Sequence, residues 1–213
     1  MAKTEVFEQY YNEYEKWFEK NKYIYLSELE AVKHFIPADK EGVEIGVGTG
    51  RFAQPLGVKI GVEPSDAMRK IAEKKGIKVY KGIAEELPLN DKSFDFALFV
   101  TTICFVDNIF KSFQEIRRIL KDNGIIIVGF IDKDSPVGKF YQLKKERSKF
   151  YKPATFYSTD EVIKILKNTG FNNFEIIQTI FGELDKIRSI QKYKKGYGEG
   201  SFVVIKASKK VDI

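Results

Sequence analysis

The sequence predicts an α/β fold: a mostly parallel sheet with helices on both faces. Two observations lead to this prediction. Short apolar segments of strand length alternate with longer amphipathic segments of helix length, and turns rich in glycine, asparagine or proline separate them. Strands that are apolar throughout are typical of parallel sheets covered on both sides. The loops that follow such strands meet at one edge of the sheet, where ligands bind.

Seven segments are predicted to be strands. Helical segments separate the first five, whereas the last two leave little room for a crossover helix between them. We therefore expect these two to form an antiparallel hairpin at the edge of a seven-stranded sheet. The predicted strands are residues 43–45, 58–62, 77–80, 94–100, 125–131, 171–181 and 200–207.

The helices are predicted from their caps and their periodicity. Ser65 and Asn108 are suitable N-cap residues, and Ser158 with Glu161 forms a capping box. Before the first strand, aromatic residues recur from Val6 at three- and four-residue steps, which predicts an amphipathic helix, and a second helix is expected over 23–35.

Composition excludes several classes of chemistry. A lone cysteine, Cys104, cannot form an internal disulfide, and a lone histidine, His34, argues against a histidine-rich zinc site and most histidine triads. We expect no metal site, Cys104 as a small buried apolar residue, and His34 in a surface or packing role. The start of the chain shows no apolar signal-peptide core and no segment is apolar enough to span a membrane, so we expect a cytoplasmic protein.

The central motif follows the first predicted strand. It reads Glu44-Ile45-Gly46-Val47-Gly48-Thr49-Gly50, is expected to open a helix, and is followed by an acid, Glu63, at the end of the second strand. Glycines in such a loop let the backbone approach a ligand closely, and an acid at the second position can accept hydrogen bonds from ribose hydroxyls.

The motif departs from two other nucleotide-binding patterns. A dinucleotide site has a third glycine where this chain has Arg51, and the carboxylate of Glu44 would repel a pyrophosphate. A P-loop needs a Gly-Lys-Ser/Thr sequence, which is absent. By contrast, the carboxylate of Glu44 would attract the cationic amino-acid end of a ligand bound at this loop.

These residues resemble the first two motifs of class I S-adenosylmethionine-dependent methyltransferases, in their small-molecule branch. The resemblance extends over about residues 40–131, because 82–88, 93–95 and 115–124 are similar to later segments of that family. It implies a Rossmann-like fold, S-adenosylmethionine as cofactor, S-adenosylhomocysteine as product, and methyl transfer by in-line displacement.

The resemblance also implies site residues. The loop of Gly46, Gly48 and Gly50, with Glu44, would face the methionine part, and Glu63 would hold the ribose. Pro64, Met68 and Ile83 would enclose adenine, with backbone groups near Ala84, since Ile83 replaces an acid found in many members. Val100 and Thr101 would flank the sulfonium, and Phe105 would close over it.

The acceptor side is read less directly. Tyr11 and Tyr14 are candidates for lining the acceptor pocket, while Asp107 and Glu85 are weak candidates for a general base, so no catalytic residue is assigned. We expect one domain over 1–213, with a helical cap (1–37), a cofactor-binding half (38–131), a lid or cap insertion (132–157), and a C-terminal helix with edge strands (158–213).

A small-molecule acceptor is favoured. A net charge of +6 keeps an RNA or protein methyltransferase open as a second possibility, although lysines are interspersed with glutamates along the chain. A non-catalytic protein that binds S-adenosylmethionine also stays open, and a dehydrogenase ranks behind it.

Overall fold

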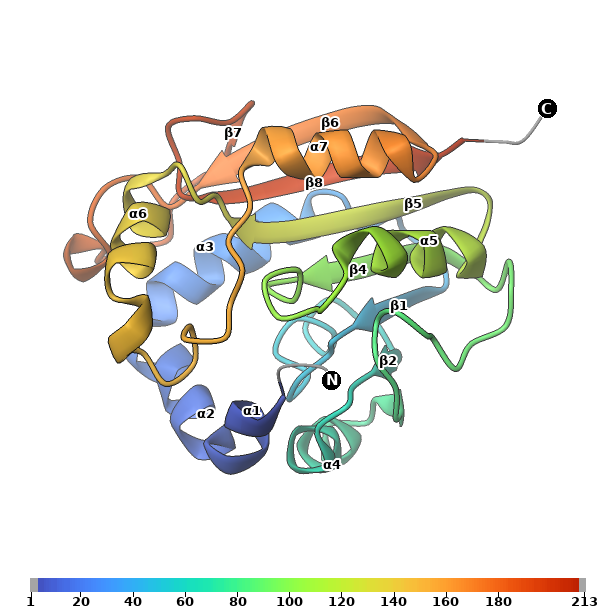
Figure 1. Ribbon diagram of the computed structural model, residues 1–213, viewed down its shortest axis with the longest axis horizontal. Coiled ribbons are helices and arrows are strands. Elements are labelled where there is room, and N and C mark those ends of the chain that lie inside the picture. The colour runs from blue at the N-terminus through green and yellow to red at the C-terminus, as the bar shows by residue number, and fades with distance from the viewer. Residues whose placement is uncertain (1–3, 211–213) are drawn as a thin grey trace.

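The computed structural model describes residues 4–210 and forms one α/β sandwich (Figure 1). Its strands are β1 (Gly42–Ile45), β2 (Ile60–Val62), β3 (Lys78–Tyr80), β4 (Phe94–Val100), β5 (Leu120–Ile131), β6 (Phe171–Thr179), β7 (Lys194–Lys195) and β8 (Phe202–Lys209). Its helices are α1 (Glu5–Gln9), α2 (Tyr11–Lys20), α3 (Lys22–Lys33), α4 (Asp66–Lys74), α5 (Ile109–Ile119), α6 (Pro136–Leu143) and α7 (Thr159–Asn168), with short 3₁₀ turns η1 (Lys145–Arg147) and η2 (Leu184–Lys186).

The sheet confirms the predicted parallel core with an antiparallel edge. The strand order is β3-β2-β1-β4-β5-β8-β6-β7. The first five strands pair in parallel, β8 runs antiparallel to β5, and β6 runs antiparallel to β8. The strand order reverses at β1, whose neighbours β2 and β4 lie on either side, and this leaves a crevice at the carboxyl ends of β1 and β4.

The strand count is eight, so the prediction of seven strands was one too low. The additional strand is β7, two exposed lysines that pair with Ile177 and Gln178 of β6. Lysines on an edge strand discourage pairing with another chain, but they carry no apolar alternation. Nothing in the sequence pattern therefore marked this strand.

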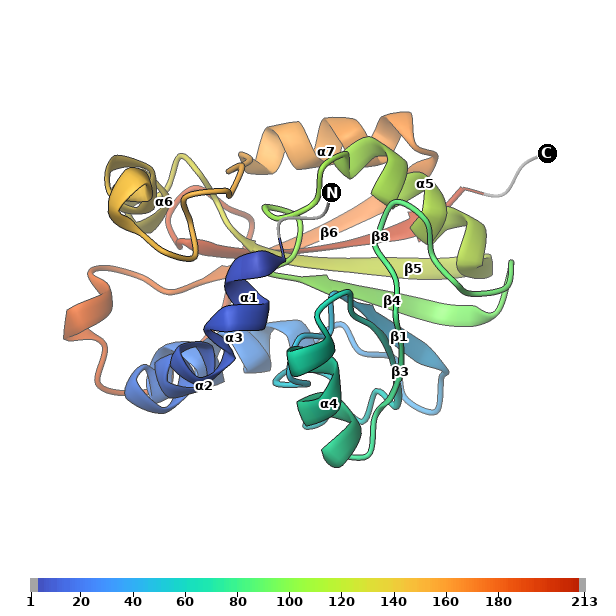
Figure 2. The same cartoon turned by 60° about the horizontal axis from the view of Figure 1, so that its bottom comes forward.

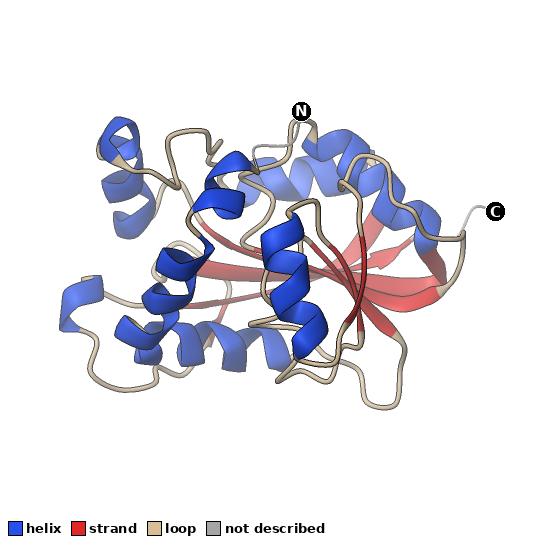
Figure 3. Cartoon of the chain, turned by 90° about the horizontal axis from the view of Figure 1, so that it is seen from below, coloured by secondary structure: helices blue, strands red, loops and turns tan. Residues whose placement is uncertain are grey.

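Helices cover both faces of the sheet. In Figure 2, α5 and α7 lie on one face and α3 and α4 on the other; Figure 3 shows the sheet between the two layers from below. Each face has its own apolar cluster, the first including Phe99 and Phe113, the second including Phe96 and Val32. The caps at Ser65, Asn108 and Ser158 all form as predicted.

Two local predictions were wrong. The segment after the glycine loop forms no helix: residues 51–57 are a series of turns in which the amide of Gln54 bonds to the carbonyl of Gly50. The first helical segment is broken at Tyr10 into α1 and α2. The break lets the chain turn across the carboxyl edge of the sheet, as contacts between α1 and α4 show.

The buried face of α5 is expected to contribute strongly to stability. Phe113 is 0% exposed and meets the ring of Phe99 edge-on at a centroid distance of 6.0 Å, whereas Phe110 on the same helix is 41% exposed. Phe113→Ala should lower the free energy of unfolding by about 3–5 kcal/mol, because it leaves a cavity in the core. Phe110→Ala should change it by less than about 0.5 kcal/mol. Urea unfolding of both variants measures the difference, and equal effects would contradict this packing.

Candidate functional site

The glycine loop lies at the carboxyl end of β1 and approaches the neighbouring crossover closely. Gly46 has φ +69°, and a side chain there would come within 2.4 Å of the side chain of Thr102. Gly48 has φ +53°, and its nearest neighbour is the ring of Tyr14, with the hydroxyl at 3.4 Å from an added Cβ. Glycine is required at Gly46 by conformation and by space, so the loop keeps its backbone exposed toward the crevice.

Glu63 links this loop to the end of β2. Its Oε2 accepts a hydrogen bond from the amide of Gly48 at 2.9 Å, and its Oε1 accepts one from the amide of Ser65 at 2.9 Å. Burial raises the pKa of Glu63 to about 7, against the effect of the two amides. Each carboxylate oxygen has a further lone pair, which can accept a hydroxyl donor from a ligand.

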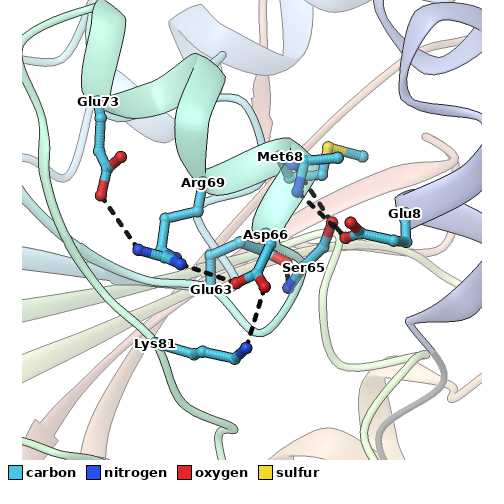
Figure 4. Close-up of polar contacts among 9 residues, drawn as sticks. Glu8, Glu63, Ser65, Asp66, Met68, Arg69, Glu73 and Lys81 are labelled. Carbon is cyan, nitrogen blue, oxygen red and sulfur yellow. Dashed lines mark hydrogen bonds and ion pairs between the residues drawn. The ribbon is translucent and has the colours of Figure 1, made fainter.

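The N-terminal helices are fastened over the same crevice. Figure 4 shows Glu8 of α1 at the start of α4, where its Oε2 accepts hydrogen bonds from the hydroxyl of Ser65 at 2.5 Å and the amide of Ala67 at 3.1 Å. These bonds lower the pKa of Glu8. On α2, Glu15 forms an ion pair with Arg51 at 2.5 Å. Segments far apart in the sequence therefore close one side of the crevice.

A cavity of about 100 Å³ lies beneath these helices, between the glycine loop and the start of α4. Nine predicted site residues line it: Gly46, Gly48, Glu63, Pro64, Met68, Ile83, Ala84, Thr101 and Phe105. Tyr14, predicted for the acceptor side, lines it as well. Sequence reasoning missed Thr4, Phe7, Val62, Gly82, Thr102 and Val106, whose positions depend on how the crossovers pack.

Three predicted cofactor residues lie outside this lining. Gly50 packs against α4 and β3: a side chain there would meet Ile77 at 2.4 Å. Val100 is buried in the sheet. Glu44 is 2% exposed; one of its oxygens accepts a hydrogen bond from the backbone of Ala53, and its Oε2 has no partner among the described residues.

Glu44 nevertheless fits a cationic ligand. Burial raises its pKa well above the usual range, and Glu63 raises it further. An orphaned oxygen of a buried carboxyl is unfavourable unless a donor reaches it. An ammonium group, or a water that it holds, would be such a donor. The carboxylates of Glu44 and Glu63 can accept hydrogen bonds from an ammonium group and from ribose hydroxyls, whereas they would repel a pyrophosphate.

A second cavity of about 230 Å³ adjoins the first. The two share four lining residues, Phe7, Tyr14, Thr101 and Phe105. Thr101 has φ +52°, which is rare for a branched side chain and is typical of functional sites. Residues 132–157 contribute several aromatic rings to this cavity, and the amide of Thr155 bonds to the carbonyl of Cys104 at 2.8 Å.

Other predicted residues take different places. Cys104 is half-buried and lines the larger cavity, so the expectation of a buried apolar residue was only partly right. Tyr11 lines neither cavity. Glu85 lines the smaller cavity, and its carboxylate accepts hydrogen bonds from the amides of Asp107 at 2.7 Å and Asn108 at 3.0 Å, whereas Asp107 lines neither cavity.

His34 is exposed and its Nδ1 lies 2.9 Å from the hydroxyl of Tyr193. Within residues 4–210, no group of three His, Cys, Asp or Glu side chains is arranged to hold a metal ion. None of the described helices is long and apolar enough to cross a membrane.

Comparisons with known proteins decide the family. Residues 43–128 match a family described as a methyltransferase domain. The chain is 53% identical, over 96% of its length and 98% of the relative, to an uncharacterized protein of Methanocaldococcus jannaschii. The crystal structure of an S-adenosylmethionine-dependent methyltransferase from Thermotoga maritima, described as a "possible histamine N-methyltransferase", is 53% identical, with a TM-score of 0.95 over 97% of this chain and 100% of that chain. The chain belongs to the S-adenosylmethionine-dependent methyltransferases.

A more distant structure shares the fold alone. The methyltransferase from Archaeoglobus fulgidus is 18% identical, with a TM-score of 0.72 over 94% of this chain and 100% of that chain. The family match and the Thermotoga maritima structure confirm the predicted class I Rossmann-like methyltransferase and its cofactor, S-adenosylmethionine.

Removing the Glu63 carboxylate should weaken cofactor binding. Glu63→Gln loses a charged acceptor for hydroxyl donors, and hydrogen bonds to charged groups contribute about 1.5–3 kcal/mol each. We expect the dissociation constant of S-adenosylhomocysteine to rise at least about tenfold. Glu41→Gln, an exposed glutamate immediately before β1, is the matched control and should bind as wild type. Calorimetry measures both; unchanged affinity in Glu63→Gln would remove Glu63 from the ribose site.

The binding of the nucleoside part should depend on pH. Since the pKa of Glu63 is raised to about 7, the carboxylate is mostly protonated at pH 6 and mostly ionised at pH 8. A protonated carboxyl accepts hydroxyl donors less well, so affinity should rise roughly tenfold from pH 6 to pH 8.

5′-Methylthioadenosine is the suitable probe, because it keeps adenine and ribose but lacks the amino acid that would meet Glu44. Titration of wild type and Glu63→Gln across this range makes the comparison. The variant should show a flat profile, and the same slope in both would assign the pH dependence to another group.

Proposed function

We propose that this enzyme transfers a methyl group from S-adenosylmethionine to a small-molecule acceptor held in the larger cavity. The observation that carries the proposal is the meeting of two cavities at Phe7, Tyr14, Thr101 and Phe105. The smaller cavity carries the cofactor motifs, so the shared wall is where a methyl group would pass. The rings of Phe7 and Phe105 in this wall would help to keep water from the reacting atoms.

Specific roles follow for the cofactor-binding residues. Gly46 and Gly48 would approach the methionine part, and Glu63 would accept hydrogen bonds from the ribose. Glu44 would hold the ammonium group, directly or through water, since its Oε2 is buried without a partner among the described residues. For adenine, the side chains of Pro64, Met68 and Ile83 would form the apolar enclosure; they line one cavity with Ala84.

The remaining predicted residues would act indirectly. Gly50 would support the loop through its packing against Ile77. Val100, buried at the end of β4, would fix the position of Thr101, the next residue. Tyr14 would belong to both the cofactor and the acceptor, whereas Tyr11 would contribute to the helical cap.

S-adenosylmethionine, when bound, supplies a methyl group on a sulfonium: the acceptor's lone pair forms the new bond to carbon, the pair of the broken C–S bond returns to sulfur, and S-adenosylhomocysteine leaves. The protein aligns the acceptor and excludes water, and such positioning contributes as much as about 7–11 kcal/mol in favourable cases. Glu85 and Asp107 are held at the start of α5 rather than in the acceptor cavity. The positioning of the acceptor therefore carries most of the catalysis.

We infer that residues 4–37 and 132–157 together form the cap of the acceptor site, 38–131 the cofactor-binding half, and 158–210 the C-terminal helix and edge strands, all in one domain. The ends of the predicted domain, 1–3 and 211–213, lie outside the described residues. An ion pair between Glu13 and Lys149, at 3.1 Å, joins the two parts of the cap. The description of the Thermotoga maritima relative, which names a small amine as its acceptor, supports a small molecule. The single cysteine agrees with a cytoplasmic location.

A partition experiment tests the acceptor class. The protein is incubated with methyl-labelled S-adenosylmethionine and a cell extract that has been separated into small-molecule, RNA and protein fractions. We expect label in the small-molecule fraction, at least about tenfold above a Glu63→Ala control, because that variant binds the cofactor weakly. Label in RNA, together with RNA binding that falls steeply with salt, would favour a macromolecular acceptor.

A further inference from the structure

The acceptor cavity contains one buried carboxylate that none of the known motifs explains. Glu28 lies in the middle of α3, is 4% exposed, and lines the larger cavity. Across residues 4–210, its carboxylate makes no hydrogen bond and no ion pair with another residue, and burial alone shifts its pKa upward. A buried carboxyl group without a hydrogen-bond partner is unfavourable to a fold, so its presence in a cavity points to a ligand that can pair with it.

Most of the remaining lining of the cavity is aromatic, and the described residues that form it include no cation. Twelve of its twenty lining residues are Phe, Tyr or Trp, and none is Lys, Arg or His. Phe7, Phe105, Tyr151 and Tyr141 form a continuous series of rings, with centroid distances of 4.8, 6.3 and 4.5 Å between successive pairs. Aromatic faces attract cations, and the attraction strengthens when water is excluded.

A second carboxylate of the lining, Glu13, differs in each of these respects. It is 50% exposed at its side chain and is already paired with Lys149. Glu28 is therefore the buried acid with which a positively charged ligand can form an ion pair.

We propose that the methyl acceptor is a small amine with an aromatic ring, whose ammonium group is bound by Glu28 while its nucleophilic atom faces Thr101 and Phe105. This inference rests on the proposed function and adds the chemical class of the acceptor. A cation satisfies both the unpaired carboxylate and the surrounding ring faces, whereas a neutral or anionic acceptor leaves Glu28 unpaired or repels it.

The arrangement of the lining sets the orientation of the acceptor. Glu28 lines only the larger cavity. Ile24, one turn earlier on α3, and Leu184 also line an outer groove between α3, α6 and η2. The wall shared with the cofactor cavity is formed by other residues. Because an ammonium nitrogen has no lone pair, it serves as the anchor. A second nucleophilic atom, in or on the ring, takes the methyl group with its lone pair as the C–S bond breaks, and the proton that leaves the methylated product is released to solvent.

The cavity volume limits the size of the acceptor. A volume of about 230 Å³ lies just below the range of about 300–1,000 Å³ that is usual for small-molecule pockets. An amine with one ring and a short chain matches this space.

Amine binding should release a proton from the protein. Burial raises the pKa of Glu28 to about 8, and the groups that face it, Tyr25, Tyr141 and Tyr151, stay neutral because their own pKa values are raised. The empty site is therefore mostly protonated at pH 7, and a bound ammonium group favours the ionised carboxylate. If Glu28 had only a structural role, amine binding would release no proton.

The test uses protein loaded with S-adenosylhomocysteine, as wild type, Glu28→Gln, and Glu30→Gln, an exposed acid of the same helix that lines neither cavity, as the matched control. Calorimetry at pH 7, in two buffers of different ionisation enthalpy, compares 2-phenylethylamine with 2-phenylethanol, which differ only in the amino group. Histamine and tyramine, which carry a second nucleophilic atom on the ring, are added as acceptors.

In wild type and Glu30→Gln, we expect the amines to bind at least about tenfold more tightly than the alcohol, with proton release. In Glu28→Gln, this preference and the proton release should disappear while S-adenosylhomocysteine binds as in wild type. Any methylated amine should keep its primary amino group.

The proposal is overturned if no amine binds to the loaded protein, if amine and alcohol bind equally, if Glu28→Gln keeps the preference, or if the primary amino group is itself methylated. Failure of S-adenosylhomocysteine to bind wild type would instead contradict the proposed function, so the two failures are distinguishable.

Discussion

The site depends on the buried carboxylate of Glu63. It accepts hydrogen bonds from the amides of Gly48 and Ser65 and so links the first two crossover connections of the sheet. This holds the glycine loop at a fixed distance from the start of α4. Burial makes the ionised form of Glu63 less favourable and raises its pKa to about 7. A ligand that donates hydrogen bonds to this carboxylate would favour the ionised form again.

The N-terminal helices contribute residues to both cavities in this crevice. Glu8 attaches α1 to the start of α4, and Glu15 attaches α2 to Arg51. The carboxylate of Glu8 lies near the surface, whereas that of Glu15 is partly buried and contacts Arg51 through both of its oxygens. Because the helix is broken at Tyr10, α1 can contact the start of α4 while α2 contacts Arg51.

Residues that the family motifs do not cover line much of the larger cavity. Residues 132–157 supply Tyr141, Tyr151 and Phe156 to the larger cavity, and α3 supplies Glu28. In sequence, Glu28 lies in a stretch where glutamates and lysines alternate with apolar residues, and it resembles an ordinary solvated acid. Its burial results from α3 lying against the sheet, a long-range contact that periodicity cannot show. The same holds for Phe7, which the helical pattern marked only as a packing residue.

By itself, the sequence determined the order of strands and helices, their caps, and the cofactor motif, because these depend on neighbours within a few residues. Apolar runs, capping side chains and glycines with positive φ act locally. Tertiary structure alone decided that residues 51–57 form turns, that β7 adds an eighth strand, and that Glu44 and Val100 lie behind the cavity wall. It also placed Glu28 within the aromatic cavity. Each of these depends on which distant segments pack together, and burial of a side chain is a property of the packed fold rather than of the residue.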